Sequence, residues 1–359
     1  MTIAVQFSYR EKEVHFIDQF IYTCFSILAK THTEIDFLFI TDNLVDAKNF
    51  PYPNQKLISL PPGMNNSIIR SFWNQIKLPA ILKRHAVEYF INNTNYCTRK
   101  TKTKQIVWID KTAVLNNKRK IARLSDYQMI LTVNEYFKKI SIAAIPEIEK
   151  KLFVTGIGFN NLSSLNHEID VEEIKNKYSD GADYFVCCFD SNQYNELIIC
   201  LKAFSQFKKW QQSNMKLLFL LNDQQKNKLF KPLSNYKYKV DIKLIDNQDA
   251  IKNGEIMAGA YSIINTNATN SISSNMLNAL QLNKPLMVAD QEYFKSSFAD
   301  GAIYTKMDEN EIAKKLILLY KDENYRNEII ENTRLFTSKY EWAAISERLW
   351  SRIMASSEN

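Results

Sequence analysis

The stretch AYSIINTNATNSISSNMLNALQLNKPLMVAD, residues 260–290, decides the fold class of this chain. We expect a buried strand at Ala260–Ile264, a polar loop, a helix over Ser273–Leu282 and a second apolar strand at Leu286–Ala289. A strand, a helix and a strand in series are typical of an α/β protein with a parallel sheet.

The same alternation extends through both halves of the chain. In the first half we expect strands at Ile3–Phe7, Phe37–Ile40, Tyr89–Ile91, Gln105–Ile109 and Met129–Thr132. In the second half we expect strands at Tyr184–Cys188, Lys216–Leu221 and Val240–Ile245, with helices between them and three more helices at the end. Asn134 is expected to cap a helix that Pro146 stops. Helices therefore alternate with parallel strands on both sides of residue 160.

The length of 359 residues favours two domains of roughly 150–200 residues each. The alternation is interrupted between Lys151 and Asp183, where glycines and short polar residues collect. We therefore expect an N-terminal Rossmann-like domain, a linker and a C-terminal Rossmann-like domain with the terminal helices, at residues 1–160, 161–182 and 183–359.

The composition is that of an ordinary soluble protein, with 45% hydrophobic and 24% charged residues. The five cysteines are odd in number and mostly lie in apolar runs, so they are expected to be reduced and buried. The four histidines are scattered away from any cysteine pair, which argues against a zinc site. With no basic leader and no apolar run of about 18 residues, we expect a cytoplasmic protein.

Positive charge is concentrated in one segment. Lys83–Arg123 contains eleven basic and two acidic residues, so it carries a net +9 within a chain whose total is +7. The segment is either a solvated face or a surface for anionic partners such as lipid headgroups or a pyrophosphate-bearing acceptor. Nucleic acid is not an expected partner, because no reader motif or aromatic ladder accompanies the charge.

Several short blocks occur along the chain in one order. They are Gln105–Ile109, Thr132–Glu135, Tyr184–Val186 followed by Asn195, Glu255–Met257, Asn270 with Asn278 eight residues later, Gly301 with Ile303, and Tyr340–Ala344. Their order and spacing resemble the retaining GT-B glycosyltransferases of the "group 1" type. The resemblance implies two Rossmann-like domains facing a cleft, with the last helix crossing back to the first domain.

The resemblance also implies an activity. Such a protein transfers a hexose from a nucleotide sugar to a bacterial-type glycan or lipid-linked acceptor, without a metal or other cofactor. If the protein handles a lipid-linked acceptor, peripheral contact with the inner face of a membrane through Lys83–Arg123 is expected.

The chain departs from the family pattern at several charged positions. Asn270 and Asn278 stand where the family has two glutamates, and Gln193 and Tyr194, just before Asn195, stand where it has an arginine and a lysine. Two cations beside a leaving diphosphate stabilise its developing charge, which neutral side chains do not. The asparagines still accept hydrogen bonds, although more weakly than carboxylates. These departures leave open a non-catalytic GT-B homologue that acts as a binding or partner subunit, which makes a pseudoenzyme the alternative.

Each remaining candidate residue has a structural alternative to its functional role. Ser271, Ser273 and Ser274 are expected to bind an anion at the start of a helix. The alternative is that Ser273 only caps this helix. Asp110 is a general base, a sugar ligand or a loop cap, and Lys111 and Arg10 either contact phosphate or are solvated. Trp73, Trp108 and Trp210 are expected to fill core space. A dinucleotide-binding dehydrogenase is excluded, since no Gly-x-Gly-x-x-Gly follows a strand.

Overall fold

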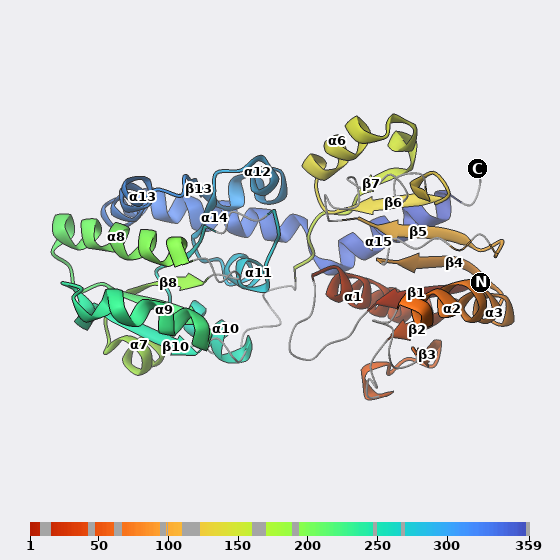
Figure 1. The fold of residues 1–359 in the computed structure, drawn as a ribbon, viewed down its shortest axis with the longest axis horizontal. Coiled ribbons are helices and arrows are strands. Elements are labelled where there is room, and N and C mark those ends of the chain that lie inside the picture. The colour runs from red at the N-terminus through yellow and green to blue at the C-terminus, as the bar shows by residue number, and fades with distance from the viewer. Residues whose placement is uncertain are drawn as a thin grey trace. The chain divides into compact units, whose positions relative to one another are not determined.

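Contacts in the computed structural model divide the chain into two compact units. Unit 1 contains Met1–Gly158 and Tyr340–Asn359, and unit 2 contains Phe159–Lys339. The structure describes residues 1–7, 16–41, 47–60, 67–93, 98, 100–109, 123–159, 170–188, 194–246, 250–266 and 270–356. Each unit has a parallel sheet flanked by helices (Figure 1), which confirms the expected α/β fold of two Rossmann-like domains.

The sheet of unit 1 has seven strands in the order β3-β2-β1-β4-β5-β6-β7. Every neighbouring pair is parallel. The strands are β1 Thr2–Phe7, β2 Asp36–Thr41, β3 Gln55–Ser59, β4 Val87–Asn92, β5 Lys104–Trp108, β6 Met129–Thr132 and β7 Leu152–Val154. The sequence did not predict the two edge strands, because β3 alternates between exposed and half-buried residues and β7 has only three residues.

The helices of unit 1 lie between successive strands, except for the one at the end of the chain. They are α1 Phe16–Thr31, α2 Ser67–Phe72, a π-helical turn Trp73–Lys77, α3 Leu78–Arg84, α6 Glu135–Ala144 and α15 Trp342–Ala355, with short 3₁₀ turns at Ala47–Asn49 and Pro146–Lys151. Asn134 caps α6 as predicted, because its side-chain oxygen accepts a hydrogen bond from the Phe137 amide at 2.8 Å.

The last helix returns to unit 1, as the family resemblance implied. Ile345, Leu349 and Ile353 of α15 are buried in one apolar cluster with α1 and strands β1 and β2. Gly158 lies against the indole of Trp342, and a Cβ atom at that glycine would stand 2.1 Å from the ring. Only glycine therefore allows the end of the first segment and the start of α15 to meet this closely.

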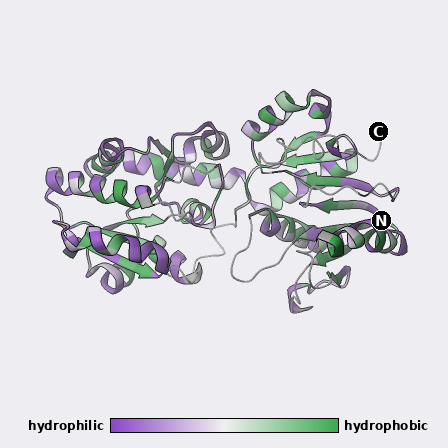
Figure 2. Ribbon diagram, viewed as in Figure 1, coloured by the Kyte–Doolittle hydropathy of each residue, from purple (hydrophilic) through white to green (hydrophobic). Residues whose placement is uncertain are grey.

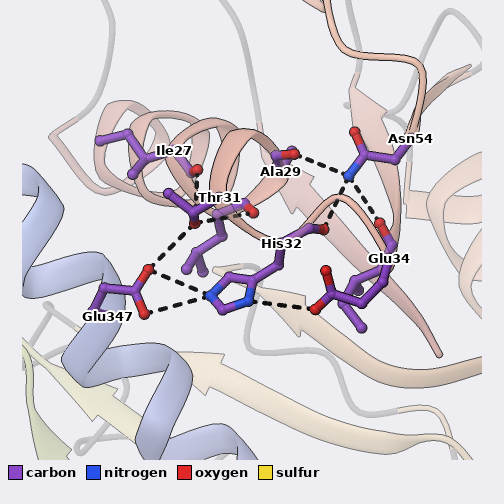
Figure 3. Close-up of polar contacts among 9 residues, drawn as sticks. Ile27, Ala29, Thr31, His32, Glu34, Asn54 and Glu347 are labelled. Carbon is purple, nitrogen blue, oxygen red and sulfur yellow. Dashed lines mark hydrogen bonds and ion pairs between the residues drawn. The ribbon is translucent and has the colours of Figure 1, made fainter.

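Polar contacts at the C-terminal end of α1 reinforce the docking of α15 (Figure 3). The Thr31 hydroxyl donates to Glu347 at 3.2 Å, and the His32 imidazole lies 3.3 Å from the same carboxylate. The His32 ring also stacks on Trp350 of α15, with centroids 4.4 Å apart. Asn54 donates to the carbonyl of Ala29 at 2.9 Å and so satisfies a terminal carbonyl of α1.

The sheet of unit 2 has six parallel strands in the order β10-β9-β8-β11-β12-β13. They are β8 Tyr184–Cys188, β9 Lys216–Leu221, β10 Ile242–Asp246, β11 Ser262–Asn265, β12 Leu286–Ala289 and β13 Ile303–Thr305. The helices are α7 Val171–Ser179, α8 Tyr194–Gln211, α9 Asp223–Ser234, α10 Ala250–Ala258, α11 Ser274–Gln281, α12 Glu292–Phe298, α13 Glu309–Lys321 and α14 Glu323–Lys339. The strands of both units are mostly apolar, while the helices carry many hydrophilic residues (Figure 2).

The structure of unit 2 differs from two of the expectations and contains one helix that was not predicted. Residues 171–179, expected within the linker, form α7, which Asp170 caps by accepting from two backbone amides. The helix α12 was not predicted. Trp210 is 71% exposed rather than in the core, because it lies on the outer face of the last turn of α8 beside Lys209. The expectation for this tryptophan is therefore wrong, whereas Trp73 and Trp108 are buried as predicted.

Four of the five cysteines, Cys24, Cys187, Cys188 and Cys200, are described, and all four are buried thiols outside any disulfide, as expected. Within the described ranges, no helix combines the length and the apolar character needed to cross a membrane.

We predict that Leu349→Ala destabilises unit 1 by about 2–5 kcal/mol, because it opens a cavity where α15 meets α1. Tryptophan fluorescence during urea unfolding reports this unit selectively, since Trp73, Trp108, Trp342 and Trp350 lie in it and only Trp210 lies in unit 2. Ser351→Ala, an exposed change in the same helix, is the control. Equal midpoints for Leu349→Ala and wild type would show that α15 does not support the core.

A second prediction concerns Lys284, whose pKa is lowered to about 8 by burial and by the neighbouring charges of Arg326 and Lys175. The folded state disfavours the charged ammonium, so the unfolded state binds more protons between about pH 8 and pH 10.5 and stability rises with pH there. We expect Lys284→Met to stabilise unit 2 at pH 7 by roughly 1–3 kcal/mol. The gain over wild type should shrink as the pH is raised through that window, whereas the exposed control Lys306→Met should show no such trend. A pH-independent difference would contradict the assignment.

Candidate functional site

The strand order of unit 2 points to one edge of its sheet. Strands β9 and β10 extend from β8 in one direction, and β11, β12 and β13 extend in the other. Ligands of open parallel sheets bind outside the carboxyl ends of the strands, at the point where the order reverses. In unit 2 this point lies between the ends of β8, at Cys188, and of β11, at Asn265.

Asn265 connects the elements that meet at this edge. Its side chain is fully buried, and its amide nitrogen donates to the Ser273 hydroxyl at 3.2 Å and to the Cys188 sulfur at 3.8 Å. The Ser273 oxygen in turn accepts from the Met276 amide at 3.3 Å, so Ser273 is the N-cap of α11. One asparagine therefore holds the end of β8, the end of β11 and the start of α11 together.

Two buried oxygens at the same edge stand out. The Oδ1 atom of Asn265 and the hydroxyl of Thr266 have no hydrogen-bond partner among the residues that the structure describes. A buried polar atom without a partner costs about 1–3 kcal/mol, so proteins rarely keep one without a ligand, water or other group to satisfy it. These atoms mark the edge as a candidate binding site.

The start of α11 adds donors at this edge. The first amides of a helix lack partners within the helix, and the helix dipole places partial positive charge there. Ser271 and Ser274 are exposed beside these amides, and Asn275 is buried. The arrangement suits an anion or the hydroxyls of a polar ligand. The capping alternative for Ser273 is confirmed, and anion binding stays a prediction.

The two asparagines of the sequence signature lie on either side of this cap. Asn270 is exposed just before α11, and Asn278 is half-buried one turn inside it. Both belong to the same short segment as Ser273, so one helix start positions them. Their roles toward a ligand stay predictions.

On the β8 side of the switch point, the next helix is α8. Asn195 is exposed in its first turn, and the next residue, Glu196, is only 3% exposed. An acidic residue in the first turn interacts favourably with the helix dipole, which helps a carboxylate remain buried there. The sequence analysis missed Glu196. The signal was a charged residue inside the otherwise apolar face of a helix, directly after the Tyr194–Asn195 pair.

Several predicted site residues lie outside the described part of the chain. They are Arg10, Asp110, Lys111 and Gln193, and the side chain of Tyr194 is not described either. The site as described therefore consists of Asn195, Glu196, Asn265, Thr266 and residues 270–278.

A comparison with family models matches residues 171–336 to the family described as glycosyl transferases group 1. Unit 2 belongs to this family. The matched segment begins at α7, ends within α14 and includes both edges of the switch point. The β11–α11 turn is thus part of a glycosyl transferases group 1 unit.

Comparison with solved structures shows the GT-B fold over the whole chain. A glycosyltransferase from Rickettsia africae has a TM-score of 0.74 at 11% identity, covering 100% of this chain and 99% of that one. HepE from Anabaena in complex with UDP has a TM-score of 0.75 at 12% identity, covering 99% and 100%. A structure titled putative UDP-N-acetylglucosamine 2-epimerase from Listeria monocytogenes has a TM-score of 0.67 at 13% identity, covering 99% and 96%. A search of curated proteins finds no significant sequence match.

These structures establish the fold of the chain, but they do not identify its reaction. At 11–13% identity, a shared fold extends from a transferase to a protein titled as an epimerase. The reaction must therefore be argued from the residues at the switch point.

We predict that Ser273→Ala destabilises α11 by about 1 kcal/mol, because the cap of the Met276 amide is lost. Ser273→Gly should cost only a few tenths of that, since glycine is tolerated at this position. Hydrogen exchange in the peptide over residues 270–282 measures the local effect, with Ser274→Ala as the exposed neighbouring control. Unchanged exchange in Ser273→Ala would show that the cap contributes nothing.

Proposed function

We propose that this protein is a glycosyltransferase that moves a hexose from a nucleotide sugar to a glycan or lipid-linked acceptor. The observation that carries the proposal is the match of residues 171–336 to glycosyl transferases group 1. Support comes from the switch point of unit 2, where the start of α11 and the buried oxygens of Asn265 and Thr266 are available to a polar ligand. HepE, which shares this fold, is titled as a complex with UDP, so a uridine diphosphate sugar is the first donor to test.

In the proposed reaction the bond between the sugar carbon and the diphosphate breaks, and a bond from that carbon to an acceptor hydroxyl oxygen forms. The diphosphate leaves with the electron pair, and the acceptor proton passes to a base, for which Asp110 is the candidate. Backbone amides at the start of α11, with Ser271 and Ser274, stabilise the charge that develops on the diphosphate. Arg10 and Lys111 are proposed to add phosphate contacts in place of the family's cations.

Neutral side chains are proposed to bind the donor. Asn270 and Asn278 accept hydrogen bonds from the sugar or ribose, and Gln193, Tyr194 and Asn195 are proposed as further donor-binding residues. We extend the resemblance to stereochemistry and propose retention at the sugar carbon without a metal. Activity unchanged by a chelator, and a product with the donor's anomeric configuration, are the expected results.

The alternative proposal is a non-catalytic GT-B homologue that serves as a binding or partner subunit. It is favoured by the neutral residues at four positions where the family has charge, namely Gln193, Tyr194, Asn270 and Asn278. A site without those charges can still hold a glycan through hydrogen bonds, yet it stabilises a leaving diphosphate less well.

The first proposal also includes the location of the protein and its contact with a membrane. We propose a cytoplasmic protein that meets its lipid-linked acceptor through peripheral contact of Lys83–Arg123 with the inner face of a membrane. This contact is separate from catalysis, because membrane binding requires no donor.

We predict that Asn270→Ala weakens uridine diphosphate binding about fivefold, since a neutral hydrogen bond that the bound ligand shields from water contributes about 1 kcal/mol. Isothermal titration calorimetry measures the affinity, and Asn324→Ala, an exposed change in the same unit, is the matched control. If uridine, guanosine, adenosine and thymidine diphosphates all fail to bind and no donor is hydrolysed, the transferase proposal fails and the binding subunit stands.

A further inference from the structure

The helical segment of residues 67–84 exposes an apolar stripe. Ile68 is 77% exposed, Phe72 50% and Ile76 52%. The opposite side of the same segment is buried, where Trp73, Leu78 and Leu82 pack in a core cluster with β1, β2 and β4. The segment is therefore anchored on one side and presents large apolar side chains to solvent on the other.

The spacing of the exposed residues shows that they share one face. Ile68, Phe72 and Ile76 recur every four residues, which places them in a line along a helix. The π-helical turn Trp73–Lys77, closed by the Leu78 amide on the Trp73 carbonyl, lies within this line. Single exposed apolar residues are ordinary, but a contiguous patch of them marks an interaction surface.

A basic groove lies beside this stripe. It has a volume of about 980 Å³ and is lined by Lys83, Lys100, Lys102 and Lys104, with Glu88 as the one acidic residue among its lining side chains. The Lys104 ammonium lies 5.5 Å from the centre of the Tyr89 ring. Within the described ranges, no ion pair involves Lys83, Lys100 or Lys102. The groove therefore presents cations to an external anion.

One helix joins the two features. Pro79, Leu82 and Lys83 of α3 line the groove, and α3 continues directly from the turn that carries Ile76. The groove lies where β4 and β5 begin, at the end of unit 1 that α3 occupies in Figure 1. Substrates of parallel sheets bind at the carboxyl ends of the strands, so this surface at the amino ends is a different site.

Building on the membrane contact of Lys83–Arg123 in the proposed function, we propose that the stripe of Ile68, Phe72 and Ile76 and the adjoining lysine groove together form a docking surface for an anionic lipid bilayer. The apolar side chains enter the interface between headgroups and acyl chains, and the lysines contact headgroup phosphates. Charge complementarity selects this occupant, because apolar residues flanked by the lysines of the groove match a surface that is apolar below and anionic above. Lysine stems also bury along apolar surface while their ammonium groups stay in water.

The test measures binding of the full chain to sedimented vesicles of phosphatidylcholine alone and of phosphatidylcholine with phosphatidylglycerol, without any sugar donor. Wild type should bind the anionic vesicles at low salt and lose affinity as salt shortens the Debye length below about 10 Å. The double changes Ile68→Ser with Phe72→Ser, and Lys100→Gln with Lys102→Gln, should each weaken binding by about tenfold. Trp210→Ser, which removes an equally exposed aromatic from unit 2, should bind as wild type does.

Each other outcome overturns the proposal. Absence of binding, equal binding to both kinds of vesicle, or unchanged binding by either double variant would show that this surface does not dock on anionic lipid. A wild-type dimer that becomes monomeric in the Ile68→Ser, Phe72→Ser variant, by light scattering, would assign the stripe to a second copy instead. Thermal unfolding of each variant checks that the fold is kept, and Ile76→Ser repeats the apolar test if the double change fails to fold. Loss of transferase activity alone has no bearing on the result.

Discussion

Parallel pairing between β8 and β11 is the interaction on which the candidate site depends. Residues far apart in the chain, Phe185 and Ser262 among them, become neighbours through this pairing. Because both strands run the same way, the helices that follow them begin at one edge of the sheet. Asn265 then fixes the local geometry by bonding to Cys188 and to the Ser273 cap. Without that pairing, Glu196 and residues 270–278 would have no common location.

The same topology gives each sheet two chemically different ends. In unit 2 the carboxyl end holds buried polar oxygens and the start of α11, which are features suited to a polar ligand. In unit 1 the amino end holds the lysine groove, which α3 connects to the exposed apolar stripe, and these features suit a charged and apolar surface. A parallel sheet separates these functions because its strands all begin at one edge and all end at the other.

Four predicted site positions of unit 2 carry neutral residues. Where the family resemblance implies ionised groups, this chain has Asn270, Asn278, Gln193 and Tyr194. In the described site, the backbone amides and the helix dipole at the start of α11 then supply most of the positive potential. They attract an anionic ligand whatever the side chains are. Under the proposed function, such a site binds a diphosphate while stabilising its departure less strongly, which is why binding and turnover have to be measured separately.

The sequence by itself determined the fold class and most strand positions. Buried parallel strands are continuous apolar runs, so β6, β8, β9 and β12 were predicted with their observed bounds. The Asn134 and Ser273 caps were also readable, because capping depends on residues three apart. Only the tertiary structure decided the features that depend on contacts between distant segments of the chain. The edge strand β3 forms by pairing with β2, Trp210 is exposed in the last turn of α8, and the buried Asn265 gains its partners from the end of β8 and the cap of α11. Local sequence encodes propensity and periodicity, whereas the neighbours that bury or expose a side chain are set by the packing of segments far apart in the chain.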